Sequence, residues 1–192
     1  MYYRKLIEKA AEALEKRGWN VHTAETGDDA RRIALSLIQE GVSVGIPGSV
    51  TVREIGLIEP LAKKCRVVQH WIKAPRDVKD QLRRREVECD VFIHSPNAVS
   101  LDGYIVICDM YGNRIAGSVL GPKTLILIAG INKLTPNLWE ALERARIIAA
   151  GINAARLDKQ PEDIRYITLI LEKAPLAIPN KHIILVNQHL GF

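Results

Sequence analysis

Apolar residues recur along this chain at two spacings, one typical of helices and the other of strands. In "LIEKAAEAL" they return every three or four residues, so residues 2–17 are predicted to form an amphipathic helix that ends at Gly18. The same spacing predicts helices at 27–40, 50–64, 76–87 and 137–157. Apolar runs predict strands at 21–25, 42–46, 66–71, 90–94, 124–130, 165–172 and 182–188.

Strands that alternate with helices are typical of an α/β domain with a largely parallel sheet, which the last two predicted strands are expected to close. The chain of 192 residues contains no linker long enough to divide it, so we expect one domain over residues 1–192, with the helix within 1–18 at its periphery. The segment "SLDGYIVICDMYGNRIAG" adds a predicted hairpin, in which residues 104–110 turn at 111–113 into a second strand over 114–120.

Composition narrows the kind of protein. With 47% hydrophobic and 26% charged residues, the chain has the composition of a soluble globular domain. Its longest uncharged apolar run, "TLILIAGI", is far shorter than the ~18 residues of a membrane span, so no membrane association is expected. The charged N-terminal helix lacks the apolar centre of a signal peptide, which predicts a cytoplasmic location. Three cysteines that lie far apart predict reduced thiols and no metal site.

The net charge of +5 raises the question of a nucleic-acid partner. The most conspicuous charged segment, 76–90, does not carry the excess, because its five basic residues are balanced by five acidic ones, as in a solvated helix. The surplus lies mainly at Lys63, Lys64, Arg66 and Lys73, where cations also complement a helix dipole. Aromatic residues are not interleaved with basic ones, so nucleic acid is not an expected partner.

Ligands of open α/β sheets bind beyond the carboxyl ends of the strands, so the loops there are the candidate sites. The first, "VGIPGSVTVREIG", places Gly48, Ser49 and Thr51 where a strand runs directly into a helix. Glycine lets the backbone approach a ligand, and free N–H groups with two hydroxyls favour an anion. Glu54, one turn further on, is a candidate acid, base or nucleophile. The alternative is a tight turn that Ser49 caps, with Glu54 in solvent.

Two further loops follow buried strands. Their candidate residues are Ser95, Asn97 and Asp102 in "HSPNAVSLDG", and Gly130, Asn132 and Lys133 in "AGINKL". As a site, Lys133 would neutralise a phosphate or carboxylate, and Asp102 would act as acid, base or nucleophile. The alternative is that Asn97 and Asp102 only form turns and that Lys133 lies in water. His94 would titrate near neutral pH, but no G-x-S-x-G segment indicates a serine-hydrolase triad.

Three segments are distinctive enough to compare with known families. They are "VGIPGSVTVREIGLIEPL", "CDVFIHSPNAVSLDGYIVICDMYGNRIAGSVLGPKTLILIAGINKLTPNLWEALERARIIAAGINAARL" and "HIILVNQHLGF". In these, the sequence resembles the LutC-like branch of the lactate-utilization (LUD) domain family over about residues 20–192. The resemblance implies a three-layer α/β/α Rossmann-like fold similar to that of the NagB/RpiA/CoA-transferase group. Members of that group bind sugar phosphates, CoA thioesters or nucleotides on loops placed like these three.

The resemblance also implies a role in oxidising L-lactate to pyruvate alongside iron–sulfur and oxidoreductase partner subunits. Many relatives carry a cysteine-rich insertion after the segment matching "NAARL", whereas this chain continues "DKQPEDIRYITLILEK" without cysteine. A metal or redox function tied to that insertion is therefore not expected, and no cofactor is indicated. Two hypotheses follow: a domain that binds a small anionic or phosphorylated ligand, or a non-catalytic subunit that assembles an oxidoreductase complex. Either is compatible with a homo-oligomer.

Within the predicted hairpin, the first turn is expected beside the ligand site and the second about 23 Å away along a straight strand. Asn97 and Asp102 are therefore retained as site candidates. Asn113 and Arg114 are assigned to the hairpin itself or to an interface.

Overall fold

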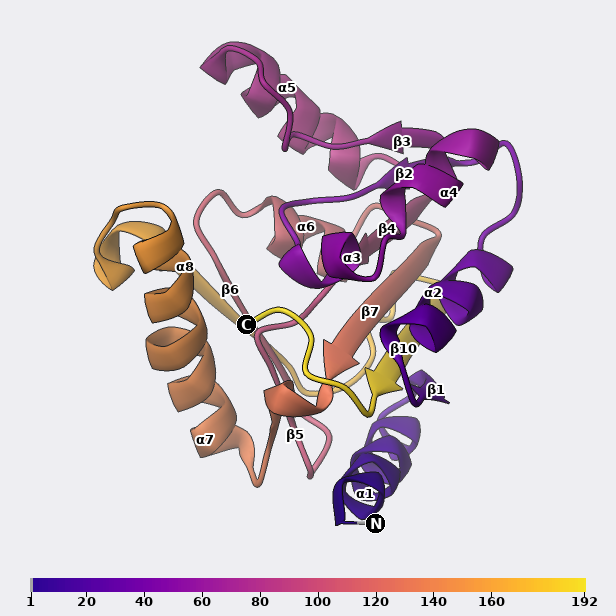
Figure 1. Cartoon of the computed structure of the whole chain (residues 1–192), viewed down its shortest axis with the longest axis vertical. Coiled ribbons are helices and arrows are strands. Elements are labelled where there is room, and N and C mark those ends of the chain that lie inside the picture. The colour runs from indigo at the N-terminus through magenta and orange to yellow at the C-terminus, as the bar shows by residue number, and fades with distance from the viewer. Residues whose placement is uncertain (1) are drawn as a thin grey trace.

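The computed structural model describes residues 2–192 and centres on a parallel sheet (Figure 1). The strands of this sheet, in spatial order, are β1 (Asn20–Ala24), β10 (Asn180–Val186), β7 (Thr124–Gly130), β4 (Val91–His94), β2 (Ser43–Gly45) and β3 (Arg66–Val68). Every pairing in the sheet is parallel. The uninterrupted apolar run "TLILIAG" forms β7, which is buried near the middle of the sheet as its composition predicts.

Both faces of this sheet are covered, which gives the three-layer α/β/α arrangement. Successive side chains of a strand point to opposite faces, so Ile126 and Ile128 of β7 join one core cluster while Leu125, Leu127 and Ala129 join the other. The helices that pack on the Ile126 face are α2 (Gly27–Ser36), α3 (Val50–Glu54) and α4 (Ile58–Lys64).

The N-terminal helix, α1 (Tyr2–Lys16), lies on the opposite face of the sheet. It buries Ile7, Ala10 and Leu14 in the cluster that also contains Leu125 and Leu127. The sequence predicts this helix at the periphery, whereas its buried stripe makes it part of the core.

A second, smaller sheet shares that core. Its strands, in spatial order, are β8 (Leu134–Thr135), β5 (Ala98–Ser100), β6 (Ile105–Asp109) and β9 (Ile167–Leu171). β6 is antiparallel to both β5 and β9, and none of these strands pairs with a strand of the parallel sheet. The sequence predicts that the strand at 165–172 closes the main sheet, and this is wrong, since it pairs with β6 instead.

The hairpin lies one turn earlier than predicted. β5 and β6 pair with each other, so the chain reverses at 101–104. After β6 the chain does not form a second strand over 114–120 but the helix α6 (Asn113–Val119). Gly112 adopts a φ of 84° just before this helix, and Ile115 and Val119 then face the core at helical spacing.

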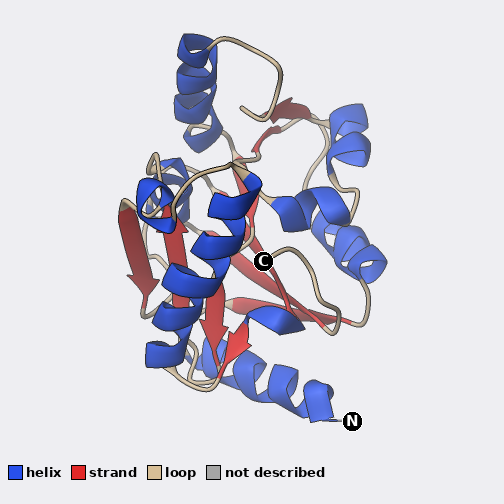
Figure 2. Ribbon diagram, turned by 60° about the vertical axis from the view of Figure 1, so that its left-hand side comes forward, coloured by secondary structure: helices blue, strands red, loops and turns tan. Residues whose placement is uncertain are grey.

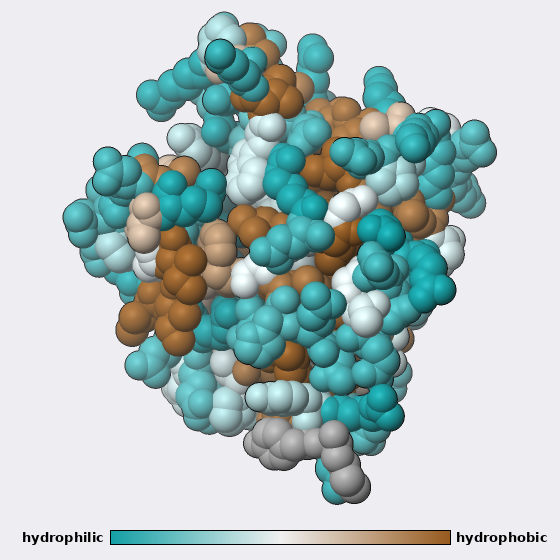
Figure 3. Space-filling view, in the orientation of Figure 1, coloured by the Kyte–Doolittle hydropathy of each residue, from teal (hydrophilic) through white to brown (hydrophobic). Residues whose placement is uncertain are grey.

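The predicted helix at 137–157 covers the second sheet (Figure 2). It consists of α7 (Leu138–Glu143), a π-helical segment (Arg144–Ala149) and α8 (Ala150–Arg156). Asn137 caps it through hydrogen bonds from Trp139 N and Glu140 N. Its outer face exposes Ile147, Ile148 and Ile152, and forms the brown patch at the left of Figure 3. The remaining helices are α5 (Arg76–Val87) and two short 3-10 turns at Ile131–Lys133 and Pro161–Ile164.

Candidate functional site

A cavity of about 430 Å³ lies where β2, β4 and β7 end. Its walls come from the segments that follow these strands and β3, from the end of β6 and the start of α6, and from the long helix that includes α8. The charged side chains that line it are Lys79, Arg83, Asp109, Arg114, Lys133, Arg156 and Lys159. Cations outnumber carboxylates on this surface, so its electrostatic potential favours an anion.

Lys133 is the most buried of these cations, with only 2% of its surface exposed. Its Nζ donates to Ser95 Oγ at 2.6 Å and to Thr51 Oγ1 at 3.1 Å. The two hydroxyls donate in turn to the carbonyls of Pro96 and Leu190, each at 3.3 Å. In the described part of the chain, Lys133 forms no ion pair with a carboxylate. Its charge is thus held by hydroxyl groups alone.

This environment changes the proton affinity of the amine. Desolvation, followed by the positive charges of Arg144 and Arg114, lowers the pKa of Lys133 to about 7, and Glu54 acts weakly in the opposite direction. Near neutral pH the side chain is therefore divided between the amine and the ammonium. A bound anion would supply the missing counter-charge and favour the ammonium.

The loop after β2 lines the cavity with Gly48, Ser49 and Thr51. Ser49 also caps α3, since its side chain accepts from Val52 N at 3.4 Å, so the turn-forming alternative holds as well. Because α3 spans only Val50–Glu54, its dipole is short, and Lys133 is the stronger attraction for an anion.

Trp71 lines the cavity and packs directly against Gly48. The guanidinium groups of Arg53 and Arg156 lie 4.6 Å and 4.9 Å from the centroid of its ring. A Cβ atom on residue 48 would overlap the Trp71 indole. Glycine is required here by close approach rather than by an unusual backbone angle.

Ser95 and Asn97, in the loop after β4, also line the cavity. Asn97 Oδ1 accepts from Cys108 N at 2.8 Å, whereas its Nδ2 donates to no other described residue and remains available to a ligand. The buried Arg144 ties this loop to the next one, because it donates to the carbonyls of both Asn97 and Asn132. Arg144 thus holds together the loop after β4 and the loop after β7.

Asn113 and Arg114 line the cavity, although the sequence assigned them to a distant turn. The reason is the direction of β6, which runs antiparallel to β5 and carries its own carboxyl end back to the ligand site. There the Asp109 carboxylate accepts from Met110 N and Arg114 N, each at 2.9 Å, and lies 3.4 Å from Arg114 Nε. Arg114 also donates to the carbonyl of Cys108. The sequence signal for this group was the polar end of the strand "IVICD".

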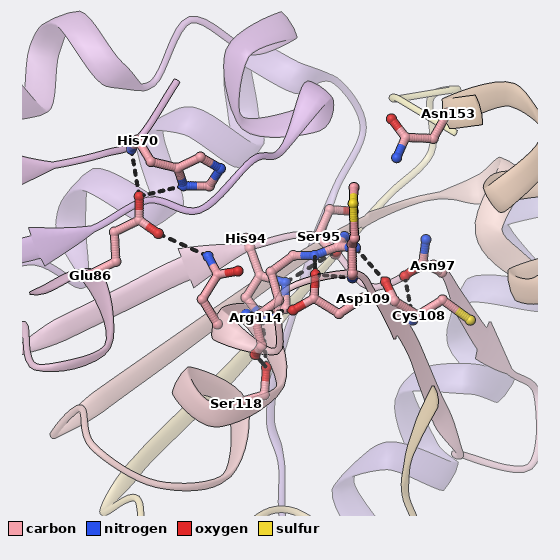
Figure 4. Close-up of polar contacts among 12 residues, drawn as sticks. His70, Glu86, His94, Ser95, Asn97, Cys108, Asp109, Arg114, Ser118 and Asn153 are labelled. Carbon is pink, nitrogen blue, oxygen red and sulfur yellow. Dashed lines mark hydrogen bonds and ion pairs between the residues drawn. The ribbon is translucent and has the colours of Figure 1, made fainter. Parts of the chain in front are cut away.

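His70 also reaches the cavity, and the sequence gave no indication of it beyond the position of "QHW" at the end of a predicted strand. Glu86 Oε1 accepts from the His70 backbone N at 2.6 Å and from Nδ1 at 2.7 Å, while Oε2 accepts from Asn113 Nδ2 at 3.0 Å. The mixed charges around Glu86 predict a solvated helix, yet its side chain is fully buried. Figure 4 shows the His70 ring with one nitrogen hydrogen-bonded to the Glu86 carboxylate and the other pointing away from that carboxylate.

His94 lies in the core rather than in the cavity. Its Nε2 is 2.8 Å from Ser118 Oγ and its Nδ1 is 3.2 Å from the carbonyl of Ser95, so both ring nitrogens have partners (Figure 4). Complete burial, with a smaller contribution from the charge of Arg114, lowers the pKa of His94 to about 3. This histidine is neutral at physiological pH. The sequence suggested instead that it would titrate near neutral pH.

Glu54, Gly130 and Asn132 contact the segment that follows β10 rather than the cavity. Glu54 Oε2 accepts from Gly191 N at 2.5 Å. Asn132 accepts from Leu190 N at 3.1 Å and donates to the Gly191 carbonyl at 3.0 Å. The missing side chain of Gly130 leaves room for the same segment. The sequence places these residues at the correct edge of the sheet. The polar groups of Glu54 and Asn132, however, are already hydrogen-bonded to the segment after β10.

The fold does not place Asp102 beside the cavity, where the sequence predicts it. It lies in the β5–β6 turn and is exposed, and its backbone carbonyl accepts from Arg17 Nε at 2.8 Å, at the end of α1. Because β5 runs away from the end of β4, this turn is at the far end of the hairpin from Ser95 and Asn97. Asp102 is therefore not part of the candidate site.

Metal binding has no support in the described residues, where no three His, Cys, Asp or Glu side chains are grouped to hold an ion. Cys65, Cys89 and Cys108 are free thiols. Over residues 2–192, no helix has the length and apolar character needed to cross a membrane.

The fold and the cavity define a three-layer α/β/α Rossmann-like protein with a cationic pocket at its strand ends. The model of the LUD domain matches residues 7–190, and the chain therefore belongs to the LUD-domain family. Among solved structures, it is similar to a DUF162 family protein from Deinococcus radiodurans, with a TM-score of 0.58 and 13% identity over 96% of this chain and 98% of the other. At that identity the likeness shows the fold alone.

Proposed function

We propose that this LUD-domain protein binds a small anionic ligand in the cavity at the strand ends, and that it serves lactate utilization as a LutC-type subunit does. The observation that carries the proposal is Lys133, a buried amine in the cavity wall that has two hydroxyl partners and no carboxylate. A buried charge without a counter-ion is costly, and an anion beside it offsets that cost.

The groups around Lys133 suit an oxyanion. Ser49 offers a hydroxyl, and Asn97 Nδ2 is an unused donor on the same surface. The Thr51 and Ser95 hydroxyls would donate to the anion in exchange for their 3.3 Å bonds to the carbonyls of Leu190 and Pro96. Hydrogen bonds from such donors to a carboxylate or phosphate are charge-assisted, and each contributes about 1.5–3 kcal/mol. Gly48 lines the same surface, and its missing side chain makes room for the Trp71 indole.

The size of the cavity sets the size of the ligand. A volume of about 430 Å³ is at the lower end of the range for small-molecule sites, roughly 300–1,000 Å³. It admits a hydroxy acid, an oxo acid or a sugar phosphate. The more exposed cations, Lys79, Arg156 and Lys159, would contact a second anionic group of a larger ligand.

Thermal unfolding against an anion panel tests the proposal. The panel contains phosphate, lactate, pyruvate, sugar phosphates, nucleotides, CoA and its thioesters. A ligand at 100 times its Kd adds about 2.7 kcal/mol to the free energy of unfolding, or roughly 5–11 °C in Tm. We expect one class of anion to give this shift in the wild type and in the control Lys63→Met, which changes an exposed lysine, but not in Lys133→Met. An unchanged shift in Lys133→Met, or no shift with any anion, would contradict the proposal.

The assembly role is the second candidate, and the exposed apolar row on the long helix favours it. Trp139, Ile147, Ile148 and Ile152 are between 46% and 77% exposed, which is unusual for large apolar side chains on one helix. Sedimentation of the purified chain, with Ile148→Lys plus Ile152→Lys as the comparison, tests for self-association through this face. Self-association lost in the double variant, together with no anion shift, would favour the assembly role.

A further inference from the structure

The carboxylate of Glu86 fixes the proton of a neighbouring ring. Glu86, on α5, is fully buried, and its two oxygens accept from the His70 backbone, His70 Nδ1 and Asn113 Nδ2. An ionised carboxylate can only accept hydrogen bonds, so His70 must carry its proton on Nδ1. The second bond, from the His70 backbone N–H to the same oxygen, fixes the position of the residue as well as its tautomer.

In the neutral ring, the lone pair is then on the other nitrogen, Nε2. It forms no hydrogen bond to any residue between 2 and 192, and His70 lines the cavity. The remaining polar groups considered for the ligand, such as Lys133 and Asn97 Nδ2, are donors. His70 Nε2 adds a neutral acceptor on a surface that otherwise presents mainly donors.

We propose that His70 is the proton acceptor of this cavity, and that Glu86 and Asn113 are positioning residues for it. The group that donates to Nε2 is an O–H of the bound ligand. In the transfer, the O–H bond breaks, its electron pair stays on oxygen, and a new N–H bond forms at Nε2. Glu86 then stabilises the positive charge on the ring, as a carboxylate does behind a catalytic histidine. The ligand class is accordingly an anion that also carries a hydroxyl group.

His94 provides an internal contrast for this assignment. Both of its ring nitrogens have partners and it does not line the cavity, which is the arrangement of a histidine that only fills the core. In His70, by contrast, Nδ1 is hydrogen-bonded to Glu86 and Nε2 has no hydrogen-bond partner among the described residues. The class of ligand rests on the proposed anion site, but the tautomer of His70 and its free Nε2 do not.

Acylation of the native full-length chain by diethyl pyrocarbonate, followed residue by residue with peptide mass mapping, tests the proposal without any ligand. We expect His70 to react at Nε2 faster than the exposed His189, and His94 not to react. Glu86→Gln should slow the reaction of His70 by at least about tenfold and leave His189 unchanged, because the amide removes the charge behind the ring. Glu88→Gln, an exposed neighbour on the same helix end, is the matched control.

A His70 that reacts no faster than His189, or equally fast in Glu86→Gln, would overturn the proposal. Should Glu86→Gln not fold, long-range 1H–15N spectra of the wild type decide the matter: a proton on Nδ1 supports the proposal and one on Nε2 overturns it. An anion panel without a thermal shift, combined with a fast His70, would remove the proposed anion site and leave His70 as a proton acceptor.

Discussion

Lys133 Nζ lies 2.6 Å from Ser95 Oγ, although the two residues are 38 positions apart in the sequence. The contact exists because β4 and β7 are parallel neighbours, in which Ile93 is opposite Ile126 and His94 is opposite Leu127. Ser95 directly follows β4 and Lys133 ends the 3-10 turn that follows β7, so both lie at the same edge of the sheet. The amine that carries the proposed site is therefore positioned by the register of the central sheet.

The burial of Lys133 predicts a pH-dependent cost to stability. Its pKa is about 7 in the folded protein against about 10.4 in the unfolded chain. Between these values the unfolded chain binds more protons, so the free energy of unfolding rises as the pH increases from 7 towards 10. Lys133→Met removes this dependence and should be more stable than the wild type at pH 7 by an amount of the order of a few kcal/mol, less so at pH 9.

Urea unfolding of wild type, Lys133→Met and Lys63→Met between pH 6 and about 9 measures that difference. Lys63 is exposed, so its replacement controls for the loss of a lysine as such. If the wild type and Lys133→Met change in parallel with pH, the amine is not buried in the way that the structure describes.

Anion binding should be coupled to proton uptake. An anion beside Lys133 raises the pKa of the amine from about 7, so above this pH the complex binds more protons than the free protein. Affinity should fall by up to about tenfold per pH unit above 7. Calorimetry at pH 8 in buffers of different ionisation enthalpy should detect uptake of up to about one proton per anion. Lys133→Met should show none, and a proton count of zero in the wild type would argue against contact with this amine.

His94 should weaken the fold in acid. Its pKa is lowered to about 3, whereas a histidine in an unfolded chain titrates near 6.5. The unfolded state therefore binds more protons between these values, and stability falls as the pH drops from 6.5 towards 3. In His94→Gln the slope of unfolding free energy against pH should be smaller by about 1.4 kcal/mol per unit between pH 4 and 6. Denaturant titrations at several pH values give both slopes, and equal slopes would contradict a neutral, buried His94.

Gly48→Ala should disturb the cavity wall at Trp71. The added methyl group overlaps the indole, so Trp71 must shift away from its contacts with Arg53 and Arg156 at a cost of about 1–3 kcal/mol. Tryptophan fluorescence and urea unfolding report the change, and anion binding should weaken. Gly151→Ala is the matched control, since open space surrounds that helical position and alanine there should be neutral or stabilising. Equal effects of the two substitutions would show that Trp71 does not restrain residue 48.

Much of the site follows from one rule applied to the sequence. An apolar run followed by small and polar residues marks the carboxyl end of a parallel strand, and this rule found Thr51, Ser95, Asn97 and Lys133. It also selected Glu54 and Asn132, because a pattern cannot distinguish a polar group that faces a cavity from one that holds a neighbouring segment. Both kinds of residue lie in the same segments after the strands.

The sequence alone determined the order of elements, the central β7 and the edge of the sheet where a ligand would bind, because apolar periodicity and strand-end loops are local properties of the chain. Only the tertiary structure decided that β6 runs back towards that edge, which brings Asp109 and Arg114 into the cavity and takes Asp102 out of it. It also joined His70 to Glu86, whose local neighbours indicate a solvated helix. Strand direction and the burial of a charge depend on which distant segments pack together, and no local spacing encodes that.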